Sequence, residues 1–72
     1  SPPVTAPAES SYEGGKISLQ SSTPGASFGY RKSKNEPWKV YSKPFDAIPG
    51  ETILVNTYRI GFKASETTIL VK

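Results

Sequence analysis

Proline and glycine interrupt this chain so often that they constrain its fold more than any other feature. Seven Pro and six Gly are spread over 72 residues, and no stretch of about eleven residues carries the 3.6-residue apolar repeat of an amphipathic helix. Proline removes a backbone donor, and both residues destabilise a helix interior. We therefore expect no helix, and about six or seven short strands arranged as a sandwich or small barrel.

Two Pro-Gly pairs predict tight turns between strands. Pro24-Gly25 and Pro49-Gly50 each place a residue with a fixed φ before one that accepts a positive φ, as a type II turn requires. The stretch from Glu51 to Ile60 that follows the second pair is the longest predicted strand. Its alternation predicts that Ile53, Val55 and Thr57 face inward.

Period-two alternation elsewhere predicts one small core. A chain of this length buries roughly 60% of its surface on folding, which is sufficient for a single core. Large aromatic side chains supply much of the buried area in such a domain. The expected core residues are Ile17, Leu19, Phe28, Tyr30, Val40, Tyr41, Ile53, Val55, Phe62, Ile69 and Val71.

The first dozen residues differ from the rest of the chain. They contain three Pro and little alternation, which is typical of a linker or an edge strand. We interpret residues 1–12 as a linker with a candidate first edge strand around Val4 to Ala6, and residues 13–72 as a single domain. Because the chain starts at Ser1, we expect a piece cut from a longer protein, with any targeting sequence elsewhere.

The composition argues against catalysis. The chain has no Cys and no His, so it lacks thiolate ligands and the side chain most often used as metal ligand and general base. Of its acidic residues, Asp46 and Glu51 are the pair that a turn at Pro49-Gly50 would bring together. Solvated loop charges are the favoured interpretation of both. We expect no enzyme activity, no metal site and no cofactor.

Four sequence blocks occur in an order that resembles a known family. They are STPGASFGYR at 22–31, WKVYSKPF at 38–45, PGET at 49–52 and RIGFKASE at 59–66. Together they are similar to fibronectin type III-associated modules, which are related to the C-terminal domain of chitobiase and β-hexosaminidase. One departure is the segment KSKNEP at 32–37, where many members carry a D-G-S-x-P turn.

The resemblance implies both a fold and a role. The fold would be an immunoglobulin or fibronectin type III-like sandwich of antiparallel strands. Such modules are appended to bacterial sulfatases and glycoside hydrolases, so the expected role is a non-catalytic accessory one. The module would pack against, or space, the catalytic domain of its parent polypeptide. The resemblance further implies a periplasmic, cell-surface or secreted protein, and a monomer as an isolated domain.

Carbohydrate binding is the alternative function that the residues support. Exposed aromatic rings stack on sugar faces, and polar side chains around them bind hydroxyl or anionic groups. The candidate rings are Trp38 and Tyr58, with Tyr41 as a further one that the core prediction claims. The candidate polar partners are Arg31, Lys39, Asn56 and Arg59. The competing interpretation is that Trp38 packs over a loop or against the parent enzyme.

Two other partner classes are disfavoured. The net charge is only +3, and the basic residues are spread along the chain apart from one short cluster, Arg31 to Lys34. Nucleic-acid binding by a small barrel would require a denser basic and aromatic surface. No apolar run approaches the ~20 residues that span a bilayer as a helix. We therefore expect no nucleic acid and no membrane insertion.

Overall fold

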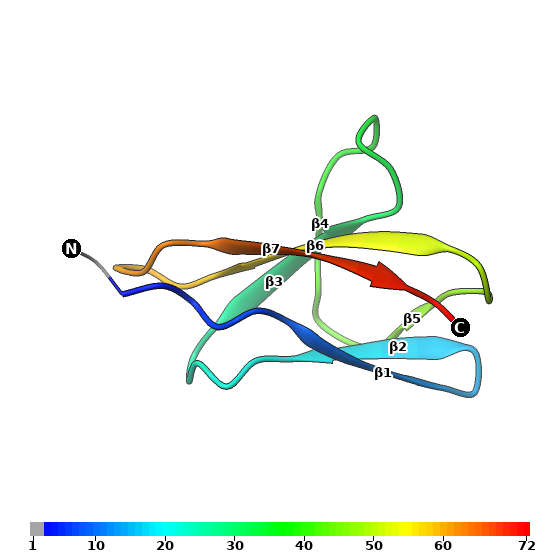
Figure 1. The fold of residues 1–72 in the computed structure, drawn as a ribbon, viewed down its shortest axis with the longest axis horizontal. Coiled ribbons are helices and arrows are strands. Elements are labelled where there is room, and N and C mark those ends of the chain that lie inside the picture. Colours follow the sequence, from blue (N-terminus) through cyan, green and yellow to red (C-terminus); the bar gives the residue numbers. More distant parts are fainter. Residues whose placement is uncertain (1–2) are drawn as a thin grey trace.

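A computed structural model describes residues 3–72, which form seven strands and no helix (Figure 1). The strands are short because turns follow one another closely along the chain. Their bounds are β1 (Glu9–Glu13), β2 (Lys16–Gln20), β3 (Ser27–Arg31), β4 (Lys39–Val40), β5 (Phe45–Asp46), β6 (Thr52–Tyr58) and β7 (Ser65–Leu70). The prediction of an all-β chain is confirmed over these residues.

The strands form two antiparallel sheets. One sheet has three strands in the order β1-β2-β5, and the other has four in the order β4-β3-β6-β7. The β6–β7 pair is the longest in the second sheet, running from Thr52 opposite Leu70 to Thr57 opposite Ser65. This arrangement is consistent with the predicted β-sandwich.

Both Pro-Gly turns form where the sequence predicts them. The N–H of Ala26 donates to the carbonyl of Thr23 at 3.3 Å, and Gly25 has a φ of 74°. At the second turn Gly50 has a φ of 93°. A side-chain-bearing residue would be strained at either glycine. Strand β3 begins directly after the first turn, and strand β6 begins directly after the second.

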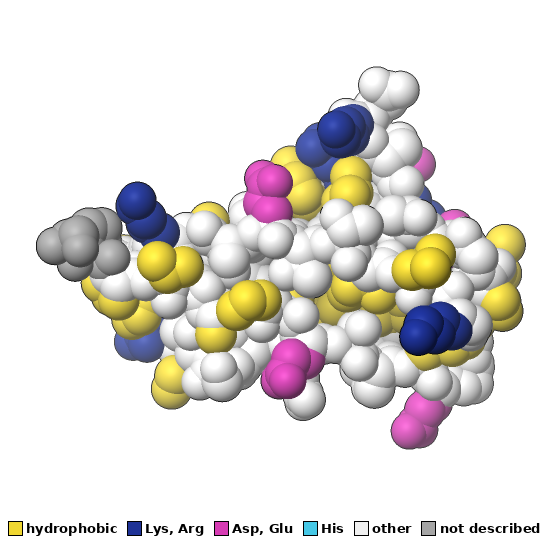
Figure 2. All heavy atoms as spheres, viewed as in Figure 1, with side chains coloured by type: hydrophobic (Ala, Val, Ile, Leu, Met, Phe, Trp, Pro, Cys, Tyr) yellow, Lys and Arg dark blue, Asp and Glu magenta, His cyan; other side chains and the backbone are white. Residues whose placement is uncertain are grey.

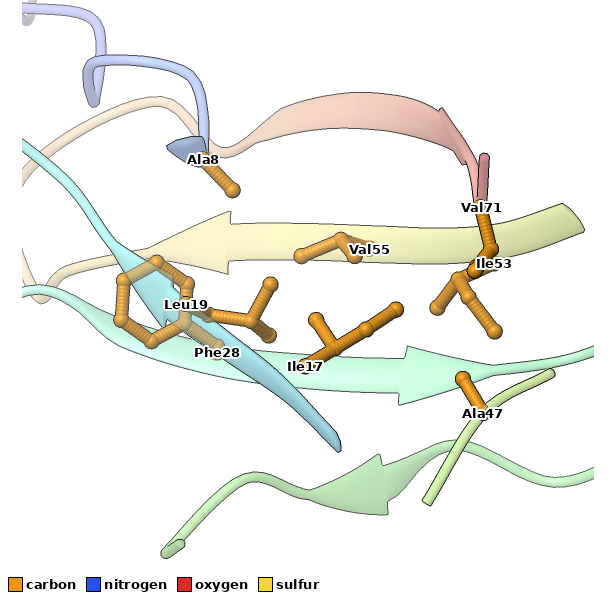
Figure 3. Packing of buried hydrophobic residues seen from close by; sticks show 8 residues of the cluster. All are labelled: Ala8, Ile17, Leu19, Phe28, Ala47, Ile53, Val55 and Val71. Atoms are coloured by element: carbon orange, nitrogen blue, oxygen red, sulfur yellow. The ribbon is translucent and has the colours of Figure 1, made fainter. Parts of the chain in front are cut away.

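The core lies between the two sheets, where side chains of facing strands meet (Figure 3). Ile53 and Val55 of β6 are fully buried, and Ile17 of β2 is 1% exposed. Each such side chain contributes about 1.5–3 kcal/mol through its removal from water. The buried cluster is Ala8, Ile17, Leu19, Phe28, Ala47, Ile53, Val55 and Val71, which confirms the predicted core residues Ile17, Leu19, Phe28, Ile53, Val55 and Val71.

Val40 corrects the core prediction. Its side chain is 74% exposed, because β4 is a two-residue edge strand and Val40 is paired with Gly29. Gly29 lies on the outer face of the sheet, since its neighbours Phe28 and Tyr30 point inward. Of the two neighbouring residues predicted to be core, Val40 therefore points outward, whereas Tyr41 packs against the core.

The remaining aromatic residues are only partly buried. Tyr30 stacks on Phe45 with ring centroids 3.9 Å apart and planes 4° apart, and both rings pack against the core. Tyr41 meets Phe28 edge-on at 5.7 Å. Phe62, by contrast, is half-buried outside the core cluster and lies under a guanidinium. Tyr30, Tyr41 and Ile69 border the core, and the core prediction was wrong for Phe62.

The segment predicted to be a linker contributes to the sandwich. Strand β1 begins at Glu9, and Thr5 is fully buried. The N–H of Thr5 donates to the carbonyl of Lys63 at 2.8 Å, and the N–H of Lys63 donates to the carbonyl of Pro3 at 2.8 Å. Val4 forms an isolated parallel bridge to Lys63, outside the named strands. The chain crosses from the edge of one sheet to the other before β1. The division of the chain at residue 12 stays a prediction.

Candidate binding site on the outer face of the four-stranded sheet

The outer face of the four-stranded sheet carries two rows of side chains beside Trp38. Residues on this face alternate with the buried ones, because successive side chains of a strand point to opposite sides. The registers of the β3–β6 and β6–β7 pairs place one residue from each of β3, β6 and β7 in each row. The first row is Arg31, Leu54 and Thr68, and the second is Gly29, Asn56 and Glu66.

Trp38 lies over the outer face because Gly29 leaves it room. A methyl group at Gly29 would meet Cε3 of the indole at 3.7 Å, which is ordinary van der Waals contact. The indole therefore packs directly over the backbone of Gly29. Trp38 remains 41% exposed, so part of the indole packs against the sheet and part is open to solvent.

Arg31 holds the indole and the preceding loop together. Its guanidinium carbon lies 4.2 Å from the centroid of the Trp38 ring, a cation–π contact of about 0.5–2 kcal/mol. Nη1 donates to the backbone carbonyls of Lys34 at 3.3 Å and Glu36 at 3.4 Å. Nε is buried and has no hydrogen-bond partner. The β3–β4 loop is therefore anchored by the same side chain that supports Trp38.

A pocket of about 250 Å³ lies between this loop and the sheet. Figure 2 shows hydrophobic and basic side chains together where the β3–β4 loop rises from the sandwich, with an acidic side chain beside them. The pocket combines an aromatic ring, aliphatic side chains, two cations, a carboxylate and two threonines. Its lining residues are Arg31, Lys34, Trp38, Leu54, Val55, Glu66, Thr67 and Thr68.

The structure brings together only part of the predicted glycan site. Trp38 and Arg31 line the pocket, and Asn56 lies in the adjacent row between Gly29 and Glu66. Sequence reasoning did not select Leu54, Glu66 or Thr68 for the site. The alternation of the strands marks these residues as outward-facing. Which of them lie beside Trp38 depends on the register between β6 and β7, which the sequence alone does not specify.

The other predicted site residues lie elsewhere. Tyr58 and Arg59 line a separate hollow of about 490 Å³ with Ile60, and the Arg59 guanidinium lies 4.9 Å from the centroid of the Phe62 ring. Lys39 is paired with Tyr30, so it points to the side of β4 opposite Val40. These residues do not form one surface with the Trp38 pocket.

The two carboxylates considered at the second Pro-Gly turn each have a lysine partner. Lys16 Nζ lies 2.8 Å from Asp46 Oδ1, and Lys32 Nζ lies 3.3 Å from Glu51 Oε2. The hydrogen bond from Lys16 lowers the pKa of Asp46 below its ordinary value. The backbone N–H of Ile48, which donates to Glu51 Oε1 at 2.8 Å, lowers the pKa of Glu51. Both groups are therefore ionised at neutral pH, unlike a carboxyl that acts as a general acid.

Over residues 3–72, no group of three or more His, Cys, Asp or Glu side chains is arranged to hold a metal ion. In the same range, no helix is both long and apolar enough to span a bilayer.

One curated protein is similar to this chain. It is the ulvan-active sulfatase of Formosa agariphila, which is 35% identical over an alignment of 69 residues. The alignment covers 89% of this chain but only 12% of the sulfatase. No family model matches the chain, and no solved structure matches it significantly. The chain is thus similar to a small module within a much larger sulfatase.

Proposed function

We propose that this chain is a non-catalytic accessory module of a larger sulfatase-type enzyme. The observation that carries the proposal is the asymmetry of the match, which covers 89% of this chain and 12% of the relative. The matched segment is thus a small part of the longer protein. In this proposal the module packs against the catalytic domain of its parent polypeptide, or spaces that domain from a neighbour.

We also propose that the sandwich is of the immunoglobulin or fibronectin type III kind. Lettered A to G in chain order, the strands give sheets A-B-E and D-C-F-G. A constant-type immunoglobulin domain has sheets A-B-E-D and C-F-G. The two arrangements differ only in the sheet to which the fourth strand belongs. The strand order therefore supports the family resemblance seen in the turns.

The chemistry of the acidic residues also supports an accessory role. Asp46 and Glu51 are each neutralised by a lysine, and their lowered pKa values make them poor proton donors at neutral pH. The parent enzyme, on this proposal, is exported and acts on polysaccharide or sulfate esters. Its module would reach the periplasm, the cell surface or the medium with it.

Two measurements test the accessory role. The chain is first assayed alone for hydrolysis of 4-nitrocatechol sulfate, where we expect no turnover above buffer. The parent polypeptide is then compared with a version lacking residues 1–72, where we expect a lower melting temperature of the catalytic domain or weaker turnover of polymeric substrate. Hydrolysis by the chain alone, or a parent without any sulfatase domain, would overturn the proposal.

A further inference from the structure

We propose that the pocket at Trp38 binds one anionic sugar unit of a polysaccharide, a ring that carries a sulfate or a carboxylate group. This binding activity extends beyond a packing or spacing role and does not depend on it. The four-stranded sheet and the β3–β4 loop form the pocket together. The residues that carry the argument are Trp38, Arg31, Lys34, Leu54, Glu66 and Thr68. Each of these side chains supplies a different part of the recognition.

The apolar face of a sugar ring needs a flat apolar surface. Trp38 is 41% exposed although Arg31 covers part of its ring. Its position is held by the Arg31 guanidinium and by the absence of a side chain at Gly29. Leu54, half-buried on the same face, provides an aliphatic floor beside it. A preorganised ring of this kind binds at lower cost than a mobile one.

The anionic group would meet two unneutralised cations. Within the basic run at 31–34, Lys32 makes an ion pair with Glu51, whereas Arg31 and Lys34 make none within residues 3–72. Both line the pocket, and Arg31 directs its hydrogen bonds from Nη1 to backbone carbonyls. The local excess of positive charge attracts a sulfate or a carboxylate.

Glu66 and Thr68 distinguish a sugar from a simple polyanion. Both stand on the outer face of β7 and line the same pocket as the cations. A carboxylate accepts hydrogen bonds from hydroxyl groups, while it repels a phosphate or free sulfate. A ligand with several hydroxyl donors and one anionic group can donate hydrogen bonds to Glu66 and place its charge near Arg31 and Lys34. Nucleic acid, with a charge on every unit, does not match both requirements.

The size of the pocket limits the ligand to about one ring. Its volume of about 250 Å³ lies just below the ~300–1,000 Å³ typical of sites for drug-sized molecules. A single unit of this size would bind weakly, with a dissociation constant on the order of 0.1–1 mM. Several copies of the module, or a catalytic domain on the same chain, would raise the effective affinity for a polymer.

The test uses the single tryptophan of the chain as its probe. Indole fluorescence is followed during titration with a sulfated carrageenan disaccharide, with digalacturonate, with neutral cellobiose and with sodium sulfate. We expect saturable changes with the sulfated sugar or the uronate. Cellobiose should bind at least tenfold more weakly, and sodium sulfate should not saturate. The stronger of the two charged sugars identifies the anionic group.

Matched variants connect the signal to the pocket. Lys34→Gln should weaken binding about three- to tenfold, whereas Lys43→Gln, which removes the same charge from an exposed loop outside the pocket, should leave it unchanged. Glu66→Gln, which keeps an acceptor oxygen but removes the negative charge, should strengthen the response to sodium sulfate while circular dichroism stays unchanged. Trp38→Ala should abolish binding measured by calorimetry.

Four outcomes would overturn the inference. They are no saturable binding of either charged sugar, equal binding of cellobiose, equal effects of the two lysine variants, and tighter binding of single-stranded DNA than of any sugar. The last two would indicate a general polyelectrolyte effect, which falls steeply with added salt. None of the four bears on whether the chain belongs to a sulfatase-type parent.

Discussion

The two faces of β6 are built from adjacent residues but buried by different parts of the molecule. On the inner face, Ile53, Val55 and Thr57 have no exposed surface, because the three-stranded sheet covers them. On the outer face, Leu54 and Asn56 are only half-buried, beside a single loop and Trp38. Stability should therefore depend on the inner face and binding on the outer face. Substitutions on the two sides should separate these properties.

Removing a core side chain should have the largest effect on stability. Ile53→Ala should lower the free energy of unfolding by about 2–5 kcal/mol, since it opens a cavity between the sheets. Val40→Ala, on the exposed edge strand, should change it by less than about 0.5 kcal/mol. Urea denaturation monitored by circular dichroism measures both. A comparable loss for Val40→Ala would mean that Val40 belongs to the core after all.

Removing the hydroxyl of Tyr41 should have the next largest effect on the free energy of unfolding. This hydroxyl accepts a hydrogen bond from the N–H of Leu19 at 3.1 Å, a donor in a buried residue of β2. Tyr41→Phe leaves that donor without a partner and should cost about 1–3 kcal/mol. Tyr58→Phe, on the outer face, should be nearly neutral. An equal loss in the free energy of unfolding in the two variants would show that the Tyr41 hydroxyl contributes no more to stability than the Tyr58 hydroxyl.

Two buried threonines should respond in opposite directions to the same change. Thr57 has a buried hydroxyl without a partner, whereas the hydroxyl of Thr5 donates to the carbonyl of Lys63 at 2.7 Å. Thr57→Val should raise the free energy of unfolding by about 1 kcal/mol, and Thr5→Val should lower it by a similar amount. Thermal melts under identical conditions provide the comparison. A loss in both variants would imply that Thr57 has a hydrogen-bond partner in solution.

Acidification should have the smallest effect on stability. It protonates the carboxylates of Asp46 and Glu51, which lie outside β6. The folded-state pKa values of Asp46 and Glu51 are lowered, so these groups stabilise the fold above about pH 4.5. Their contribution is lost as the pH falls through the folded-state pKa values, because the unfolded chain then binds protons more readily.

Melting temperatures measured between pH 7 and pH 3 test the acid effect. The difference between the native chain and Asp46→Asn should shrink as the pH falls. A difference that grows on acidification would contradict the sign of the shift.

Much of the inner face was predictable, because two simple signals agree there. Turn chemistry at Gly25 and Gly50 marks where strands begin, and alternation then assigns Ile17, Ile53 and Val55 to the core. Alternation fails at Val40, because a two-residue strand contains too few positions to establish which face is inside. It also misses Ala8 and Ala47, since small residues carry little hydrophobic signal although both are buried.

The outer face was harder to predict from the sequence. Trp38 and Arg31 were chosen for their chemistry, and they do lie together. Glu66 and Thr68 join them only because β7 pairs with β6 in one particular register, which no local pattern specifies. Tyr58 and Arg59 were chosen by the same chemical reasoning but lie in another hollow. Chemistry alone suggested the residue types, and the strand pairing decided which of them meet.

The bridge at Lys63 has a mechanical consequence. The segment that starts at Pro3 and the segment that ends at Lys72 lie toward opposite ends of a molecule 38 Å long (Figure 1). Tension along that axis is carried at one end by the hydrogen bonds between Lys63 and the segment from Pro3 to Thr5. At the other end it is carried by those of Val71 with Gly50 and Glu51. Because Val4 runs parallel to the chain at Lys63, pulling shears those bonds together rather than opening them one at a time. A sandwich loaded in this way should resist extension along its long axis.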